Sequence, residues 1–587
     1  MSKKSTITPI YTKWGEKLDR EHPLQEYPRP QMRRNSYLNI NGVWSYAFTK
    51  SGERPQRFDG EITVPFSPEA PLSGVNRQLK PDEYLWYNRK FNVSEDFISK
   101  HTFVNFGAVD QTAEVYVNGT KIGEHSGGYT PFACDCTSVL HSGENEITVC
   151  VRDFTGESDF SFGKQKLDRG GIWYTAQSGI WQTVWLESVP DAYIKHIKIT
   201  PMFDECSVKF EVFTNKACSE INVLIKDGSD TVAYGKADKN GVCTVYMGEG
   251  FKPWNTENPF LYDAEVFADG DVVYSYFGMR KFSTLEENGH KELALNNKPI
   301  FHTGLLDQGY WSDGLYTPPD DEAMIYDITA AKEYGFNMLR KHIKTEPLRW
   351  YYHCDRLGML VWQDMVSGGD KNYSPLVVQA LPYVGIMLDD THYSRFGRES
   401  ESGRNRFIQE CKETVELLYN CTCIAVWVPF NEGWGQFDAK KVYSMFKELD
   451  PTRHIDHASG WHDQKCGDFN SKHVYYKKVR MKPDGRIMAL TEFGGFSMPC
   501  EGSMASDIKF GYKIFDTRDE LMQAYKKLFE REVFPLTEGK GLSATVYTQL
   551  SDVEDEINGL LTYDRRVKKA DRKTLAEINN RLKNSLK

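Results

Sequence analysis

The sequence lacks the features that mark a membrane protein or a nucleic-acid-binding protein. No stretch of its 587 residues approaches the roughly 18 apolar residues of a transmembrane helix. The amino-terminal segment MSKKSTITPIYTKWGEKL has two lysines but not the apolar core of a signal peptide. The net charge is −10 and no long basic run occurs. We therefore expect a cytoplasmic protein that binds neither nucleic acid nor membranes.

Signatures of metals and redox cofactors are also missing. The twelve cysteines are scattered, with no CxxC pair and no paired histidines, so we expect reduced packing residues and no zinc site. No strand–GxGxxG–helix segment is available for a flavin or a nicotinamide. Repeats and low-complexity segments are absent as well. These absences predict a protein that works without a metal or a cofactor.

Aromatic residues are abundant. They make up 13% of the chain, with 13 Trp and 32 Tyr. Most of them can be explained as packing in β-sandwich cores, but aromatic rings also stack on the apolar faces of sugars. The length of the chain suggests roughly three to five domains.

The first half of the chain has the pattern of β-sandwiches. From about residue 38 to 190, short alternating runs such as VWSYAF, EITVPF and EITVCVRD are separated by turn residues. A second set of such runs, from 191 to 284, has the length of one immunoglobulin-like sandwich. Neither region contains a helix of normal length. We predict a jelly-roll domain at residues 1–190 and an immunoglobulin-like domain at residues 191–285.

After Leu285 the pattern changes to strands that alternate with helices. Eight strands and four helices of this kind predict a (β/α)8 barrel, a TIM barrel, over residues 286–587. The interval 459–487 leaves no room for full helices after the fifth and sixth strands. The predicted strands are 299–306, 336–343, 359–365, 423–430, 454–459, 473–477, 487–493 and 544–550, and the helices are 320–335, 346–358, 405–420 and 438–450.

Polar residues stand at the ends of these predicted strands. In a barrel the carboxyl ends of the strands form one mouth, where active sites lie. Two glutamates at the ends of strands four and seven would supply the two carboxyl groups that glycosidic cleavage requires. A separation of about 5–5.5 Å favours retention of configuration, and about 6.5–9.5 Å inversion. The strand-end residues are Asp307, Gln308, Arg340, His342, Asp364, Asn431, Glu432, His473, Tyr475, Glu492 and Gln549.

Six segments together resemble glycoside hydrolase family 2, the family of β-galactosidases, β-glucuronidases and β-mannosidases. They are FGAVDQTAEVYVNG (106–119), SGIWQTVWLE (178–187), GFNMLRKH (335–342), DRLGMLVWQD (355–364), WVPFNEGW (427–434) and LTEFGGF (490–496). The resemblance covers the whole chain. It implies a sugar-binding jelly roll, an immunoglobulin-like sandwich and a catalytic TIM barrel, in that order.

The resemblance also implies roles for the two glutamates. Glu432 is the implied general acid/base and Glu492 the implied nucleophile, with retention of the β configuration. A general acid must be protonated, so we expect the pKa of Glu432 to be raised by the aromatic residues Trp427, Phe430 and Trp434 and by the charge of Glu492. Asn431 can donate to the sugar 2-hydroxyl.

The remaining candidate site residues could have structural roles instead of catalytic or binding roles. Arg340 can keep Glu492 ionised, or form an ion pair inside the barrel without catalytic consequence. Tyr475 can hydrogen-bond the nucleophile or belong to the core. The other predicted sugar contacts, which could equally be packing residues, are His342, His473, Asp307, Trp362, Asp364 and Trp434. Glu554 and Glu556 are expected to fix the turn after the eighth strand.

The identity of the sugar stays open. Glucuronidases of this family carry an Asn-x-Lys after the eighth strand, and the segment after Leu550 has none. The short sequences VWQD and TEFG are more similar to those of β-mannosidases. The segment 366–405, with Arg395, Arg398 and Arg404, is expected to shape the pocket.

The prediction is a metal-independent, retaining exo-β-glycosidase that acts on a carbohydrate substrate. β-Galactosides are the first candidate substrates, and β-mannosides and β-uronides are the next candidates. A non-catalytic carbohydrate-binding protein is the alternative from a different class, and the pair of glutamates argues against it. Whether the chain forms a homo-oligomer cannot be read from its sequence.

Overall fold

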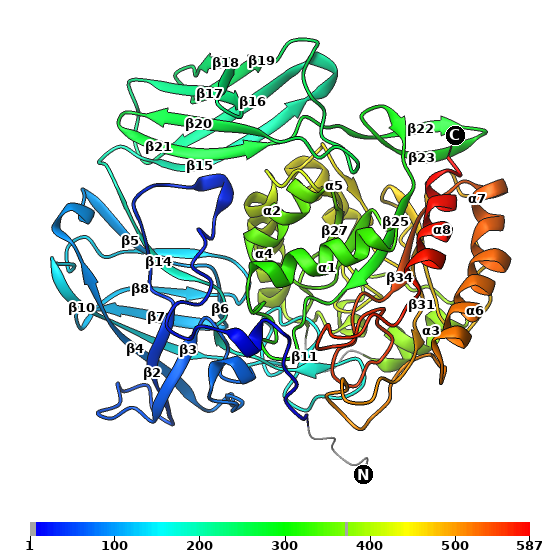
Figure 1. Cartoon of the computed structure of the whole chain (residues 1–587), viewed down its shortest axis with the longest axis horizontal. Helices are drawn as coiled ribbons and strands as arrows, with labels where there is room; N and C mark the ends of the chain where they lie inside the picture. Colours follow the sequence, from blue (N-terminus) through cyan, green and yellow to red (C-terminus); the bar gives the residue numbers. More distant parts are fainter. Residues whose placement is uncertain (1–6, 370–373, 587) are drawn as a thin grey trace.

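The computed structural model describes residues 7–369 and 374–586. Figure 1 shows three regions side by side: a first β-sandwich, a second smaller β-sandwich, and a barrel of strands wrapped by helices. The predicted fold class of jelly roll, immunoglobulin-like sandwich and TIM barrel is therefore correct.

The first sandwich packs a six-stranded antiparallel sheet against a four-stranded one. The orders are β3-β2-β4-β10-β7-β8 and β1-β14-β5-β9. Alternating apolar residues of both sheets, such as Trp44, Tyr87 and Leu186, fill the space between them. The strands are β1 (Tyr37–Asn39), β2 (Gly42–Thr49), β3 (Gly60–Val64), β4 (Tyr84–Val93), β5 (His101–Phe106), β6 (Val109–Asp110), β7 (Thr112–Val117), β8 (Thr120–Ser126), β9 (Phe132–Asp135), β10 (Gly143–Arg152), β11 (Gln165–Lys166), β12 (Tyr174–Thr175), β13 (Gly179–Ile180) and β14 (Val184–Val189).

The second sandwich is built the same way from three and four strands. Its sheets have the orders β15-β16-β19 and β18-β17-β20-β21. A short three-stranded sheet, β22 (Phe282–Glu287), β23 (His290–Leu295) and β24 (Lys298–Pro299), then leads into the barrel. In the described part of both sandwiches the only helical segments are single turns. The sandwich strands are β15 (Ile194–Met202), β16 (Ser207–Thr214), β17 (Ile221–Asp227), β18 (Asp230–Lys236), β19 (Val242–Tyr246), β20 (Tyr262–Ala268) and β21 (Asp271–Phe277).

The barrel contains eight parallel strands in the order β29-β28-β27-β26-β25-β34-β31-β30. Neighbouring strands in this sheet follow one another in the sequence, and β34 returns to pair with β25, as in a barrel. Only β29 and β30, at the two edges of the sheet, are not paired with each other, so the barrel is nearly closed. Its strands are buried on both faces, which explains their continuous apolar runs. They are β25 (His302–Asp307), β26 (Met338–Lys341), β27 (Leu360–Asp364), β28 (Ile424–Val428), β29 (His454–Ile455), β30 (Phe469–Val474), β31 (Ile487–Gly494) and β34 (Leu542–Thr548).

Six of the predicted barrel strands overlap the observed ones closely. The fifth, predicted at 454–459, comprises only His454–Ile455, and the sixth is displaced. It was predicted at 473–477 but runs from Phe469 to Val474. The aromatic ring of Phe469 packs on Trp362 inside the barrel, at 4.9 Å between ring centroids, and this contact sets the start of the strand. As a result His473 lies within the strand and Tyr475 just after it.

Amphipathic helices cover the outside of the barrel (Figure 1). The four predicted helices are present within a few residues, and in the described chain no helix follows β29 or β30, as expected. No described helix has the length and apolarity needed to cross a membrane. All twelve cysteines are free thiols, and eight of them are buried. The main helices are α1 (Asp321–Glu333), α2 (Leu348–Leu357), α4 (Glu401–Leu418), α5 (Ala439–Leu449), α6 (Arg518–Leu528), α7 (Phe534–Lys540) and α8 (Arg572–Lys583).

Candidate active site

The carboxyl ends of the barrel strands bring eight of the predicted side chains into one buried, hydrogen-bonded group. Four of these side chains belong to strands β26, β27, β30 and β31, and the other four to the segments that follow β26, β28 and β30. Residues between positions 340 and 492 therefore meet at one mouth of the barrel. This convergence is what the barrel topology predicts for strand-end residues. The group consists of Arg340, His342, Asp364, Asn431, Glu432, His473, Tyr475 and Glu492.

Arg340 lies at the centre of this group. Its guanidinium donates two bonds to Asp364, at 2.9 and 3.0 Å, one to Glu492 Oε1 at 3.1 Å and one to Asn431 Oδ1 at 2.9 Å. Burial opposes the charge of Arg340, but Asp364 and Glu492 outweigh that effect and raise its pKa. The side chain is thus a fixed cation that orients Glu492 and also Asn431, the residue next to Glu432.

Glu492 is held by two donors. Arg340 contacts its Oε1, and the Tyr475 hydroxyl donates to its Oε2 at 2.5 Å. The ring of Tyr475 stacks on Tyr512 with 3.8 Å between centroids, which fixes the direction of that hydroxyl. The register between β30 and β31 shifts just before His473, so that His473 pairs with Glu492. Such irregularities re-aim side chains next to active sites.

Glu432 leaves its strand in an unusual conformation. Its φ is 52°, in the left-handed region, and its N–H donates to Ser459 O at 3.0 Å. Gly433 follows with φ 75°, and a β-carbon there would lie 2.6 Å from His462. Glycine is therefore required after Glu432. This turn directs the Glu432 carboxyl back over the barrel mouth.

The surroundings of Glu432 favour its protonated form. Burial raises the pKa of Glu432 to about 7, the charges of Lys164 and Arg340 oppose the rise, and the charge of Glu556 adds to it. The predicted aromatic wall is partly wrong: Trp427 donates to Asp450, and Phe430 stacks on Phe407 of α4. Both therefore face the helices.

His473 links the two glutamates. Its Nδ1 lies 2.9 Å from Glu432 Oε1 and 3.6 Å from Glu492 Oε2, and burial lowers its pKa to about 4. Its Nε2 lies 3.1 Å from Ser459 Oγ and 3.3 Å from Nη1 of Arg340, which can only donate. With Nε2 as the acceptor, Nδ1–H donates to Glu432 Oε1. Among the described residues nothing bonds the other oxygen, Oε2, so it can face a substrate.

Asn431 presents an unused donor. Its Oδ1 accepts from Arg340, and this bond fixes the orientation of the amide. The amide nitrogen, Nδ2, is buried and has no partner in the described structure. A buried donor without a partner is rare and costs about 1–3 kcal/mol. Such a group is ready to donate to a bound hydroxyl.

The spacing of the two glutamates is short. Ligand-type atoms of Glu432, His473 and Glu492 all lie within 4.8 Å of one another. A pair of carboxyl groups about 5–5.5 Å apart suits double displacement, because no room is left for a water between sugar and carboxylate. A metal ion could also bridge the three residues, but each already has a hydrogen-bond partner, and metal independence stays a prediction.

Three predicted site residues lie outside the hydrogen-bonded group. Asp307 accepts from Lys341 at 2.7 Å, and the Trp362 indole donates to His302 at 3.0 Å inside the barrel. Trp434 packs beside the mouth on Trp173, with 5.2 Å between ring centroids. Its indole nitrogen is buried without a partner in the described structure.

The first sandwich also contributes to the barrel mouth, which was not predicted from the sequence. The segment between β10 and β13 reaches the barrel mouth, where Trp173 packs on Trp434 and the Tyr174 hydroxyl bonds Glu556. Glu554 accepts from Arg169 and Thr175, so it joins the turn after β34 to the first sandwich. The signal in the sequence is the length of this connection, since long loops inside compact domains are usually functional.

The segment 366–405 lies beside the end of β28. Residues 370–373 fall outside the described part. Arg398 is buried and donates to Gly435 O at 2.9 Å, and Arg404 donates to Arg398 O at 2.7 Å. These arginines thus support the turn that carries Glu432. Arg395 belongs to a short turn, Tyr393–Phe396.

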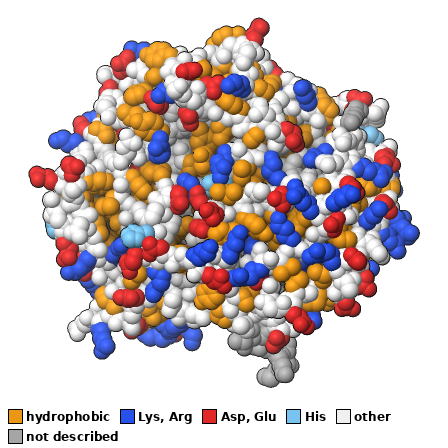
Figure 2. All heavy atoms as spheres, viewed as in Figure 1, with side chains coloured by type: hydrophobic (Ala, Val, Ile, Leu, Met, Phe, Trp, Pro, Cys, Tyr) orange, Lys and Arg blue, Asp and Glu red, His pale blue; other side chains and the backbone are white. Residues whose placement is uncertain are grey.

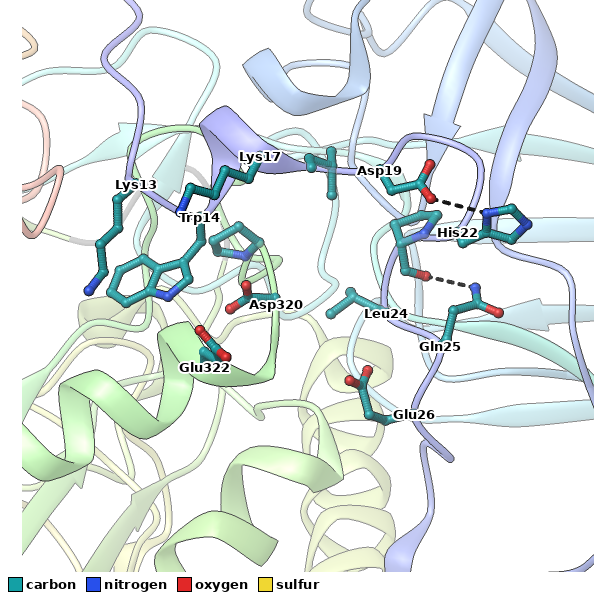
Figure 3. Close-up of a pocket in the computed structure, with 13 residues that line it drawn as sticks. Lys13, Trp14, Lys17, Asp19, His22, Leu24, Gln25, Glu26, Asp320 and Glu322 are labelled. Carbon is teal, nitrogen blue, oxygen red and sulfur yellow. Dashed lines mark hydrogen bonds and ion pairs between the residues drawn. The ribbon is translucent and has the colours of Figure 1, made fainter.

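A separate hollow of about 360 Å³ lies between the amino-terminal segment and the start of α1 (Figure 3). Trp14 and Asp320 line it, and neither glutamate of the candidate site does. Across the face in Figure 2, acidic and basic side chains are interspersed.

Two family models match the chain. The sugar-binding-domain model of glycosyl hydrolases family 2 matches residues 75–190, and the TIM-barrel-domain model of that family matches residues 287–491. Together they cover more than half of the sequence. The chain belongs to glycoside hydrolase family 2.

Curated relatives are similar over part of their length. A beta-galactosidase of Thermoanaerobacter pseudethanolicus is 25% identical over 379 residues, which cover 60% of this chain and 50% of that protein. A beta-glucuronidase of Streptococcus agalactiae is 24% identical over 461 residues, covering 73% and 72%. The chain spans about half the length, or less, of most of the curated relatives it matches.

Solved structures share the fold. An uncultured Clostridium beta-glucuronidase superposes with a TM-score of 0.73 at 18% identity, covering 94% of this chain and 99% of that one. A beta-galacturonidase from Eisenbergiella tayi gives a TM-score of 0.68, also at 18% identity, covering 94% and 98%.

Proposed function

We propose that the chain is a retaining exo-β-glycosidase that hydrolyses terminal β-linked sugars by double displacement, with β-galactosides as the leading substrates. The observation that carries this proposal is the pair of buried glutamates at the ends of β28 and β31, close together but in different surroundings. Relatives named beta-galactosidase support the choice of sugar. Relatives named beta-glucuronidase make β-glucuronides the second candidate.

In the first step Glu492 attacks the anomeric carbon while Glu432 protonates the leaving oxygen. Arg340 and Tyr475 donate to the two oxygens of Glu492 and hold it in position to attack the sugar. The pKa of Glu432, raised to about 7, keeps a proton available at neutral pH. The products of this step are a glycosyl ester on Glu492 and a free alcohol.

In the second step water replaces the alcohol. Glu432, now a carboxylate, takes a proton from the water, and the water oxygen attacks the anomeric carbon as the ester to Glu492 breaks. His473 donates to Glu432 in its charged state, and Asn431 can donate to the sugar 2-hydroxyl as positive charge develops on the ring. Two inversions give net retention.

The test is a panel of 4-nitrophenyl β-glycosides, followed by proton NMR of the first-formed sugar. We expect hydrolysis of at least one member, fastest for a β-galactoside, with the β-anomer appearing first. Release of the α-anomer would contradict the retaining mechanism. No hydrolysis of any member, with sugar binding intact, would support the non-catalytic alternative.

A further inference from the structure

A lysine of the first sandwich is fixed at the barrel mouth. The N–H groups of Phe162 and Gly163 donate to Ser367 O, at 3.1 and 2.8 Å, and so join the sandwich segment to the loop after β27. A β-carbon on Gly163 would lie 3.0 Å from Ile343 O, next to His342 of the candidate site. Lys164 follows directly, and its carbonyl accepts from the N–H of Tyr174 at 2.9 Å. Its position is therefore set by backbone contacts on both sides.

The Lys164 side chain is mostly buried, but its ammonium nitrogen is not fully enclosed and has no bonded acceptor among the described residues. Its side chain is only 7% exposed, and its nitrogen lies 4.0 Å from Glu556 Oε2, beyond hydrogen-bond distance. It also lies 5.1 Å from the ring centroid of Tyr174. In the part of the chain that the structure describes, no acceptor bonds this ammonium. An ammonium has three donors, and because the nitrogen is not fully enclosed these donors are available to water or to a bound hydroxyl.

Glu556 is the matching acceptor. It is 2% exposed, its Oε2 accepts from the Tyr174 hydroxyl, and its Oε1 lies 3.4 Å from Asn558 Nδ2. The charges of Lys164 and Glu556 both affect the pKa of Glu432, Lys164 by lowering it and Glu556 by raising it. Lys164 and Glu556 are therefore close enough to Glu432 for their charges to act on it. They lie on the side of the mouth that the first sandwich and the loop after β34 contribute.

The positive charges of this region are matched by carboxylates. Arg340 is paired with Asp364 and Glu492, and Arg169 with Glu554 and Asp555. Lys164 faces Glu556. Each of these described cations thus has a carboxylate beside it, and the carboxylate of a uronic acid would meet the negative charges of residues 554–556.

We propose that Lys164 and Glu556 are specificity-determining residues that bind hydroxyl groups of the terminal sugar as a charged donor and acceptor, and that they select neutral β-glycosides over β-uronides. A sugar hydroxyl both accepts and donates, so it can bond either partner of the pair. This inference rests on the proposed glycosidase function and names the substrate class within it.

The test compares 4-nitrophenyl β-galactoside with the β-galacturonide, and the β-glucoside with the β-glucuronide, because the members of each pair differ only at C6. In the wild type we expect kcat/KM for the neutral member of at least one pair to exceed that for its uronide by tenfold or more. Lys164→Met should lower the neutral rate by about 10- to 100-fold. Glu556→Gln should narrow the ratio of neutral to uronide rates by about tenfold.

The matched control is Lys166→Met, two residues further along the same segment but with its ammonium over Trp173 at 4.1 Å. It should leave the ratio unchanged. Thermal unfolding of each variant reports whether it folds. If the two variants do not fold, the hydrolysis of 3-deoxy, 4-deoxy and 6-deoxy galactosides by the wild-type protein tests the inference instead. Removal of a hydroxyl that bonds Lys164 or Glu556 should lower kcat/KM by at least tenfold.

A wild-type preference for uronides would overturn the inference while leaving the glycosidase proposal intact. Equal losses of both rates in Lys164→Met and Glu556→Gln, with an unchanged ratio, would reduce the pair to a structural contact and also overturn it. If no glycoside is hydrolysed, the proposed function itself fails. In that case calorimetric titration with galactose and galacturonate decides the inference, which predicts tighter binding of galactose.

Discussion

The ends of β28 and β31 carry the same residue type in opposite electrostatic surroundings. Glu492 faces the Arg340 guanidinium and the Tyr475 hydroxyl, which both stabilise a carboxylate. Glu432 has no direct cationic partner among the described residues. It sits in a strained turn against a neutral histidine, and burial raises its pKa to about 7. In the proposed mechanism neighbouring groups, and not the glutamates themselves, assign the roles of nucleophile and acid.

The largest expected effect comes from changing Glu492. In Glu492→Gln the amide cannot form the glycosyl ester, so kcat should fall on the order of 10⁴-fold or more. Steady-state kinetics with a 4-nitrophenyl glycoside measures this effect. Glu416→Gln, at an exposed position of α4, is the control and should keep wild-type activity. Activity within tenfold of wild type in Glu492→Gln would remove this residue from the mechanism.

Changing Glu432 should give an effect that depends on the leaving group. Glu432→Ala should barely slow the glycosylation step for an activated phenol, yet slow it by about 10²- to 10⁴-fold for an alkyl or sugar aglycone. Azide needs no general base, so it should restore turnover of the activated substrate and yield a β-glycosyl azide. NMR identifies the product, and an α-azide would contradict a covalent intermediate.

The pH dependence of wild type sharpens the same contrast. Glu432 acts as an acid only when it is protonated, and its pKa is raised to about 7. With a poor leaving group, kcat/KM should therefore fall by about tenfold for each pH unit above 7. The positive charge of Lys164 lowers this pKa, so Lys164→Met should move the alkaline limb to higher pH. A profile that stays flat to pH 9 would argue against Glu432 as the acid.

The smallest predicted effect concerns Tyr475. Tyr475→Phe keeps the ring that stacks on Tyr512 but removes the hydrogen bond to Glu492 Oε2. A hydrogen bond to a charged group is worth about 1.5–3 kcal/mol, so kcat should fall by about 10- to 100-fold. The exposed neighbour Tyr476 provides the control, since Tyr476→Phe should behave as wild type. Equal kinetics in the two variants would show that the Tyr475 hydroxyl plays no part.

Much of this site could be predicted from the sequence because barrel strands have a recognisable pattern. Once the strands are placed, topology alone brings Arg340, Glu432 and Glu492 to one mouth. The errors arise where side-chain packing decides. Phe469 shifted the start of β30, and the alternation of strand residues turned Trp427 towards the helices.

The contribution of the first sandwich could not be predicted from local patterns. Lys164 and Glu556 are almost 400 residues apart, and their meeting depends on how the sandwich docks against the barrel. Neither residue stands at the end of a barrel strand. Only the unusual length of the connection between β10 and β13 indicated that this part of the chain has a function beyond the sandwich.

The central claim is that Glu492 forms a covalent bond to the sugar, and trapping tests it most directly. The wild-type protein is incubated with an activated 2-deoxy-2-fluoro β-glycoside, digested, and mapped by mass spectrometry. The fluorine slows both steps and the activated leaving group restores the first, so the ester should accumulate. We predict a single glycosyl label on Glu492, and none in Glu492→Gln. A label on Glu432, Glu556 or any other carboxylate would contradict the assignment.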